Sequence, residues 1–201
     1  MTTSSSNSWH GLAELLLAGP QYRRSGTIRL RVTPAGFATV AAPDVQAEAD
    51  ALVVEGRRIP YAGQTFAELA AAAGLDVGAP EGLYKDGSGA SADDPVVTTD
   101  AEVVLGGLAI GDAALRRFAP DQTPVLWPEH FDVGISLDEV NYGVSTGDSA
   151  VSEPYAYVGP WTPREGGFWN MSFGAARPLR ELGDAAAVAA FFAEGRAAAA
   201  G

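Results

Sequence analysis

The stretch LWPEHFDVGISLDEVNYGVS, residues 126–145, decides the fold expected for the second half of the chain. From Phe131 onward, apolar and polar residues alternate, which is typical of a β-strand with one buried face. The alternation resumes after Asp138 and Glu139 and continues to Ser145. The pattern therefore predicts a hairpin over residues 131–145 with Asp138 and Glu139 at its tip.

This hairpin has an expected register in which Leu137 faces Val140, Gly134 faces Gly143 and Asp132 faces Ser145. The apolar face then comprises Phe131, Val133, Ile135, Tyr142 and Val144, and the opposite face comprises His130, Asp132, Ser136, Asn141 and Ser145. Two facing glycines leave bare backbone, on which something must pack. The sequence allows an aromatic side chain of the same chain, such as Trp161 or Trp169, or a flat ligand.

Three ionisable residues at the start of the hairpin are the candidate catalytic residues: Glu129, His130 and Asp132. If the alternation reaches back to His130, its imidazole shares a face with the Asp132 carboxylate, which would orient the ring and raise its pKa. Such a pair suits general acid–base catalysis, a static hydrogen bond at a strand end, or a hydrogen bond to a ligand. These alternatives stay open at this point.

Other kinds of site find little support in the sequence. With two His and no Cys, a transition-metal site would need mostly carboxylates, so no metal is expected. The segment GDSAV, residues 147–151, begins like a serine-hydrolase elbow, but Val151 replaces the second glycine. Neither a dinucleotide-binding glycine motif nor a Walker loop is present, so no organic cofactor is expected.

An aromatic-rich stretch, EPYAYVGPWTPREGGFWNMSFG, follows at residues 153–174. Its rings could fold back as a small core, form the wall of a ligand pocket, or anchor a homodimer. The pocket interpretation adds polar contacts from asparagine side chains. The candidate ligand-binding residues are Trp127, Gly134, Asn141, Tyr142, Gly143, Tyr155, Tyr157, Trp161, Trp169 and Asn170.

The whole chain predicts an α+β fold, with helices flanking a mainly antiparallel sheet or two strand meanders. Residues 1–7 are expected to form a disordered tail and 8–201 a single α+β domain, with two loosely similar halves split near 76–97. Four further helices are expected: one over 8–18 that Gly19–Pro20 stops, two that start with capping boxes at 65–68 and 99–102, and a final one over 184–198. The expected strands are a hairpin over 26–42 and two strands over 45–49 and 51–55. A flexible loop is expected over 86–94.

Charge and length limit the class of partner. The 201 residues carry a net charge of −12 and a single lysine, Lys85, so nucleic acid and anionic membrane surfaces are poor partners. No apolar run approaches the roughly 20 residues of a membrane span. The N-terminus also lacks the order of a secretory signal, and a cytoplasmic location is expected.

Four stretches carry a resemblance to a known group: YRRSGTIRLRVTPAGFATV at 22–40, PVLWPEHFDVGI at 124–135, VNYGVSTGD at 140–148 and EPYAYVGPW at 153–161. Through them nearly the whole chain resembles a family of uncharacterised actinobacterial proteins. The resemblance implies no reaction. It does imply that the functional centre lies between Trp127 and Trp169.

The leading expectation is a small-molecule-binding protein with an aromatic-lined pocket in residues 127–170. The first alternative is a cofactor-independent hydrolase, isomerase or cyclase that uses His130 and Asp132 as an acid–base pair. The second alternative is a homodimeric interaction protein that uses the aromatic loop.

Overall fold

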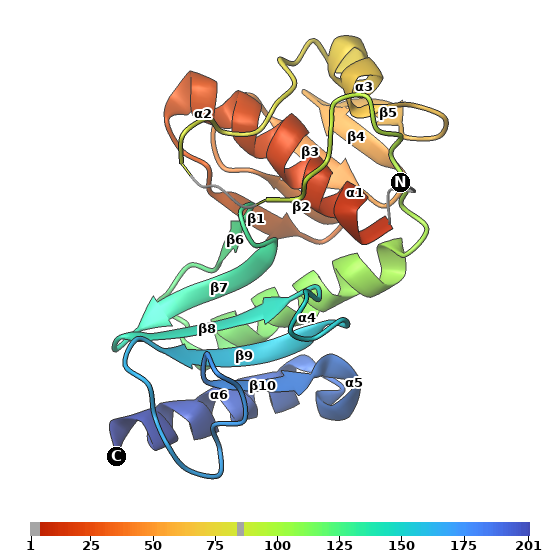
Figure 1. Ribbon diagram of the computed structural model, residues 1–201. Coiled ribbons are helices and arrows are strands. Elements are labelled where there is room, and N and C mark those ends of the chain that lie inside the picture. The colour runs from red at the N-terminus through yellow and green to blue at the C-terminus, as the bar shows by residue number, and fades with distance from the viewer. Residues whose placement is uncertain (1–4, 84–86) are drawn as a thin grey trace. The chain divides into compact units, whose positions relative to one another are not determined.

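The computed structural model describes residues 5–83 and 87–201, and its chain forms two compact units (Figure 1). The first unit comprises residues up to Leu105 together with Leu126–Phe131, and the second comprises Gly106–Val125 and Asp132–Gly201. The division expected near 76–97 falls inside the first unit. Within that stretch, the Gly78 amide donates to the Leu15 carbonyl of the N-terminal helical run at 3.0 Å.

The first unit opens with a continuous helical run made of α1 (Ser5–Gly11), the π-helical segment η1 (Leu12–Ala18) and α2 (Gly19–Ser25). The prediction that Gly19–Pro20 stops this helix is wrong. In the π-helical turn the Gly19 amide bonds to the Glu14 carbonyl, five residues back, and Pro20 then occupies the first turn of α2, where no intrahelical donor is required. Ser5–Asn7 belong to α1, not to a tail, and residues 1–4 lie outside the described residues.

The helical run packs on an antiparallel sheet. In the order β6-β1-β2-β3-β4-β5, the strands are β6 (Val125–Trp127), β1 (Leu30–Thr33), β2 (Gly36–Thr39), β3 (Val45–Glu48), β4 (Ala51–Val54) and β5 (Arg57–Pro60). The first hairpin and the meander after it are confirmed, with Thr33 paired to Gly36. η1 contacts β1, β2 and β3, and its seven residues are all buried.

The helix α3 (Phe66–Ala73) begins and ends as the sequence predicts. The Thr65 side chain accepts from the Glu68 amide, and the Glu68 carboxylate accepts from the Thr65 amide, which completes the capping box. At the other end, Gly74 has φ 70°, a left-handed conformation that glycine adopts without a steric penalty.

The second unit is built on the strands β7 (Asp132–Leu137), β8 (Val140–Ser145), β9 (Tyr155–Pro160) and β10 (Ala175–Pro178), in that order and all antiparallel. The expected hairpin register is confirmed from Asp132–Ser145 to Leu137–Val140. Asp138 and Glu139 have φ of 54° and 61°, as in the type I′ turn that suits a two-residue hairpin. The antiparallel strands and flanking helices of the two units confirm the α+β class.

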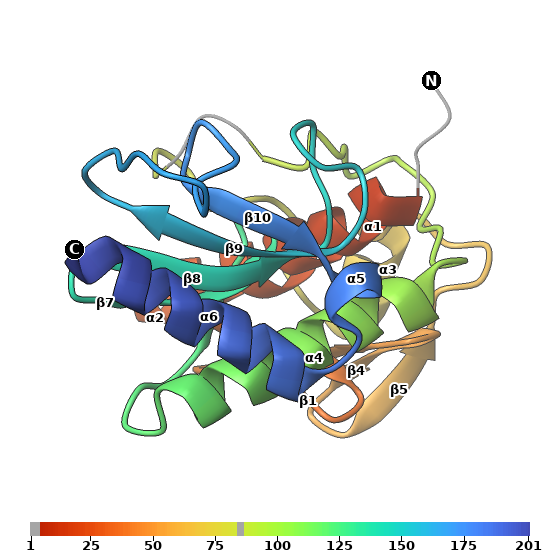
Figure 2. The same cartoon turned by 90° about the horizontal axis from the view of Figure 1, so that it is seen from below.

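Helices cover one face of these four strands, as Figure 2 shows. The ring of Tyr142 packs against Phe118 at 4.8 Å and Phe192 at 5.9 Å. These two rings come from α4 (Ala101–Phe118) and α6 (Ala185–Ala200), and the short α5 (Leu179–Leu182) precedes α6. The predicted final helix is confirmed, with Asp184 as its N-cap. Within the described residues no helix has the length and apolar character needed to cross a bilayer.

Candidate functional site

The bare backbone at Gly134 and Gly143 is covered by Tyr157, which comes from the adjacent strand β9. A Cβ atom added to Gly143 would lie 2.5 Å from the Tyr157 hydroxyl oxygen, and one added to Gly134 would lie 3.0 Å from it. An aromatic side chain of the same chain therefore packs on the glycines. It is neither Trp161 nor Trp169, and a flat ligand could take this place only if Tyr157 moved away.

Tyr157 and its strand neighbour Tyr155 are tied to carboxylates. The Tyr157 hydroxyl donates to Asp132, and the Tyr155 hydroxyl donates to Asp148 at 2.6 Å. Burial is the main cause that raises the pKa of each phenol, and the neighbouring carboxylate raises it further. Both tyrosines therefore stay protonated near neutral pH and act as fixed hydrogen-bond donors.

The expected pairing of His130 with Asp132 depends on an alternation that ends too early. Phe131 has φ 50°, so the extended strand conformation begins only at Asp132, and His130 lies outside it. The Asp132 carboxylate accepts from Tyr157, whereas the His130 side chain is 71% exposed and lies 4.0 Å from Glu129. The reason for expecting an acid–base pair of these two residues therefore fails.

Most of the other ligand-binding candidates have structural roles. Tyr142 is fully buried in the core, where burial raises its pKa to about 12. The ring of Trp127 lies 5.8 Å from the Arg29 guanidinium, and that of Trp169 packs edge-on against Phe168 at 4.8 Å. The Asn170 side chain pairs with both backbone groups of Ala176.

One aromatic candidate, Trp161, lies exposed at the surface of the second unit, and so does Phe173, which was not a candidate. Trp161 is 62% exposed, and its indole N–H donates to the Asn141 side chain at 3.1 Å. Phe173, in the same Gly- and Pro-rich loop, is 37% exposed. The loop thus packs the half-buried Phe168 against Phe191 and leaves Trp161 exposed, which is a mixture of the alternatives expected from the sequence.

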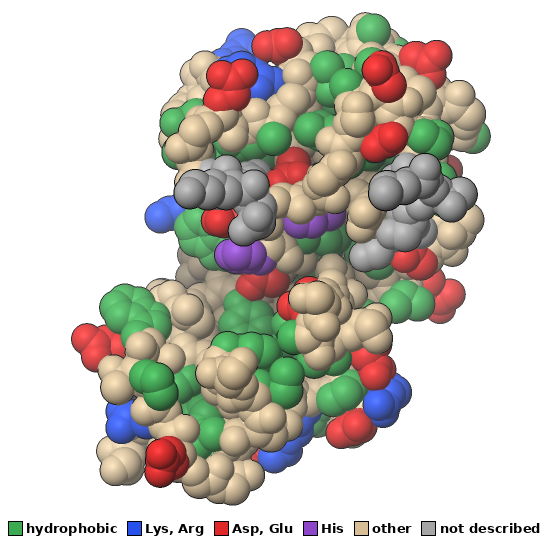
Figure 3. All heavy atoms as spheres, in the orientation of Figure 1, with side chains coloured by type: hydrophobic (Ala, Val, Ile, Leu, Met, Phe, Trp, Pro, Cys, Tyr) green, Lys and Arg blue, Asp and Glu red, His purple; other side chains and the backbone are tan. Residues whose placement is uncertain are grey.

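A different pair of ionisable residues lies in the first unit: the half-buried His10 and the buried Glu14, one helical turn apart. The His10 Nε2 lies 2.6 Å from the Pro128 carbonyl and 3.7 Å from the Glu14 Oε1. A carbonyl only accepts hydrogen bonds, so Nε2 carries a proton. The imidazole also stacks on Phe131, with 5.7 Å between ring centroids. Figure 3 shows both histidine side chains of the chain, in purple, on one face.

The Glu14 carboxylate is held by the loop that follows residue 86. Its Oε2 accepts from the Ser88 amide at 2.8 Å and from the Ser88 hydroxyl at 2.5 Å. A Cβ atom at Gly87 would lie 2.2 Å from Oε1, so only glycine allows the loop this close. Oε1 is buried and has no hydrogen-bond donor among the residues that the structure describes. Part of the predicted flexible loop is thus anchored, while Asp86 lies outside the described residues.

Two unusual backbone features adjoin this pair. Glu14 belongs to the π-helical segment η1, and π-helical turns often occur at functional sites. Phe131, which stacks on His10, has a positive φ that costs a non-glycine residue about 1–3 kcal/mol. The stretch that raised the question of chemistry, residues 129–131, therefore does lie beside a half-buried imidazole, but that imidazole is His10.

Sequence reasoning missed His10 and Glu14, although one signal was present. The segment LAELLLA, residues 12–18, holds a single carboxylate inside an otherwise apolar run, four residues after a histidine. On a helix that spacing places both side chains on one face. A lone charge in a buried helix needs a partner or a purpose, and this feature could have identified the pair.

His10 gives a testable pH dependence of stability. Burial is the main cause that lowers its pKa below 6.5, although Glu14 acts in the opposite direction. As the pH falls, the unfolded chain therefore takes up the proton before the native protein does. The free energy of unfolding should be fully maintained above pH 6.5 and should decline between pH 6.5 and the lowered native pKa.

This decline can be measured by denaturant unfolding over that pH range, with the histidine pKa values followed by NMR. His10→Gln should remove it, whereas His130→Gln should leave most of it in place, because the charge of His130 is only a minor cause of the lowered pKa of His10. A measured pKa of His10 at or above 6.5 would contradict the expectation.

Comparisons of the chain with protein-family models, with curated proteins and with solved structures found no match. The resemblance to an actinobacterial family therefore stays a prediction. Within the described residues, no group of three or more His, Asp or Glu side chains could hold a metal ion. Any proposal about function therefore depends on the contacts, burial and charges of the described residues.

Proposed function

We propose that the protein binds a small polar organic molecule beside His10 and Glu14, and that this molecule donates a hydrogen bond to Glu14. One observation carries the proposal: the buried Oε1 atom of Glu14 lacks a hydrogen-bond donor among the described residues. Leaving a buried polar atom in this state costs about 1–3 kcal/mol, and more for a charged group. An N–H or O–H group of a ligand would remove this cost.

The state of His10 supports the same proposal. Its Nε2–H is directed at the Pro128 carbonyl, and its lowered pKa favours the neutral ring near pH 7. In that tautomer Nδ1 is an acceptor. The expected ligand is therefore rich in donors, as an alcohol or an amine is.

Native mass spectrometry of the purified protein is the first test. A retained ligand would appear as an extra mass that is lost under denaturing conditions. Glu14→Gln keeps an oxygen for Ser88 but removes the charge, so we expect it to lose that mass. Glu102→Gln, at an exposed position of α4, is the matched control and should retain it.

Weak binding requires a second measurement, ligand-observed NMR with ethanolamine, ethylene glycol and phenol as probes. At least one probe should bind the unaltered protein and the Glu102→Gln variant and fail to bind Glu14→Gln. Binding that is equal in the two variants would contradict the proposal. So would an apo chain that binds none of the probes.

Acid–base catalysis without a cofactor is the second candidate function, with His10 and Glu14 in place of His130 and Asp132. The observation in its favour is the 3.7 Å distance between the His10 Nε2 and the Glu14 Oε1, next to a ring whose pKa is lowered. For any compound found to bind, His10→Gln should abolish turnover and spare retention. A pure binding protein would show no turnover in either form.

The other functions expected from the sequence stay predictions. They are an aromatic-lined pocket in residues 127–170, a homodimer formed through the aromatic loop, and a cytoplasmic location. Neither of the two pockets described below is lined by the aromatic candidates. The native mass spectrum also tests the homodimer, because a dimer appears at twice the mass of the chain.

A further inference from the structure

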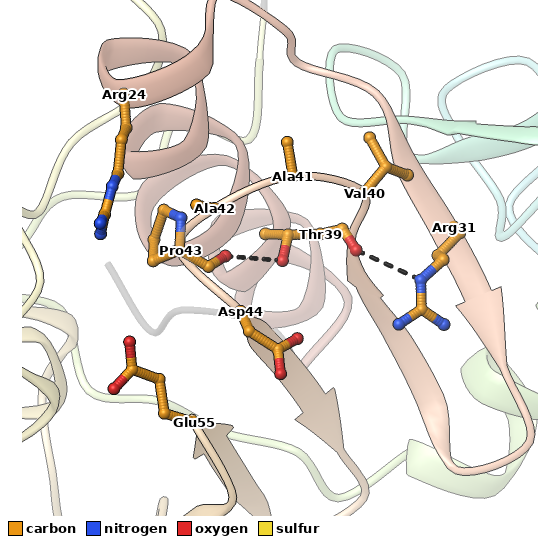
Figure 4. Close-up of a pocket in the computed structure, with 9 residues that line it drawn as sticks. All are labelled: Arg24, Arg31, Thr39, Val40, Ala41, Ala42, Pro43, Asp44 and Glu55. Carbon is orange, nitrogen blue, oxygen red and sulfur yellow. Dashed lines mark hydrogen bonds between the residues drawn. The ribbon is translucent and has the colours of Figure 1, made fainter.

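A pocket of about 400 Å³ lies in the first unit, beside the loop between β2 and β3 (Figure 4). Residues 39–44 form one wall, and side chains from α2, β1 and the β4–β5 turn complete the lining. A second hollow of about 300 Å³ shares Arg24, Pro43 and Glu55 with the first. Both volumes fall within the range of small-molecule sites.

The loop that forms the wall is held in place from beneath. The buried Gln21 side chain accepts hydrogen bonds from the amides of Val40 at 2.7 Å and Ala41 at 2.8 Å. The hydroxyl of Thr39 donates to the Pro43 carbonyl at 2.8 Å and accepts from the Val45 amide at 3.1 Å. Because these bonds already order the loop, a ligand need not do so on binding.

The lining carries two positive and two negative side chains: Arg24, Arg31, Asp44 and Glu55. Arg31 is partly engaged, since its Nε donates to the Thr39 carbonyl at 3.2 Å. Figure 4 shows the Arg24 guanidinium and the Glu55 carboxylate on the same side of Pro43, with their charged ends directed toward each other. No hydrogen bond joins these two groups, both of which are described residues.

We propose that this pocket binds a small zwitterion of the amino-acid type, with its carboxylate on Arg24 and its ammonium group on Glu55. Opposite charges on separate walls bind both ends of such a molecule by charge-assisted hydrogen bonds. A simple anion would be attracted by Arg24 but repelled by Glu55 and by the net charge of −12 of the chain. A simple cation would be attracted by Glu55 but repelled by Arg24. The zwitterion alone satisfies both groups.

Titration of the isotope-labelled protein with single free amino acids, followed by amide NMR, tests the proposal. At least one amino acid should shift the amide signals of the pocket wall, residues 40–42 and 44, to saturation. Acetate and ethylammonium chloride, each at matched ionic strength, should give no saturating shift. If every amino acid leaves these signals unchanged, or if acetate alone reproduces the shift, the proposal is overturned.

Two charge-removing variants test the assigned contacts. Arg24→Gln and Glu55→Gln should each weaken binding at least about tenfold, as the loss of one charge-assisted hydrogen bond implies. Arg164→Gln, an exposed arginine of the second unit, is the matched control and should bind as the unaltered protein does. Unchanged binding in both pocket variants would contradict the assignment. Glu14→Gln should leave this pocket unaffected, so its outcome separates this site from the one beside His10.

Discussion

Replacing Gly111 with alanine should lower the free energy of unfolding by about 1–3 kcal/mol. At Gly111, α4 lies against the strands β7 and β8. The added Cβ would lie 2.7 Å from the Cγ1 of Val133 and 2.7 Å from the Cβ of Val144, and both valines are fully buried. The helix would have to move away from the sheet, which opens space in the core around Tyr142. Denaturant unfolding followed by tryptophan fluorescence measures the effect.

The same helix supplies a matched control. A Cβ at Gly106 would meet no atom within 4 Å. Gly106→Ala should therefore stabilise the protein by up to about 1 kcal/mol, because alanine favours the helix over glycine. The two changes are chemically identical and should have opposite signs. If Gly111→Ala is as stable as Gly106→Ala, α4 does not pack against the sheet this closely.

Replacing Tyr157 with alanine should cost about 3 kcal/mol, the lower end of the range for removing a fully buried aromatic ring, because Tyr157 is half-buried. The ring covers the backbone of Gly134 and Gly143, and its hydroxyl donates to the buried Asp132. Tyr157→Phe keeps the ring and removes only the hydroxyl, so it should cost less, about 1–3 kcal/mol. The difference in the free energy of unfolding between the two variants measures the contribution of the ring, and the loss in Tyr157→Phe measures that of the hydrogen bond.

Trp161→Ala is the control for this series, because it removes a larger ring from the same sheet at an exposed position. Its stability should change by no more than about 0.5 kcal/mol. Thermal or denaturant unfolding of the three variants side by side provides the measurement. A Tyr157→Ala variant as stable as Trp161→Ala would show that the glycines do not need this cover.

The hairpin of the second unit could be predicted down to its register, because a period of two residues and one buried face leave a single alignment. The same rule failed one step earlier. Extended back through Phe131, it placed His130 beside Asp132, but a positive φ at Phe131 ends the strand there. A single backbone conformation of this kind has no periodic signal, so pattern reasoning could not find it.

The site beside His10 could not be assembled from sequence for a different reason. His10 and the Pro128 carbonyl are 118 positions apart, and only the fold brings them together. The need for glycine at position 19 likewise depends on the fold, since an added Cβ would lie 1.7 Å from the Gly78 carbonyl oxygen, 59 positions along the chain. In contrast, the capping box of α3 is local, and the sequence predicted it correctly.

The path of the chain has a consequence for its synthesis. The chain leaves the first unit after Leu105, returns to it after Val125 and leaves again after Phe131, so the strand β6 joins the first unit only on this return. On the ribosome, the first unit therefore cannot complete its sheet or close Pro128 over His10 until part of the second unit has emerged. A gene fragment that ends at residue 105 would encode a sheet whose β1 edge is uncovered, and such an edge invites aggregation.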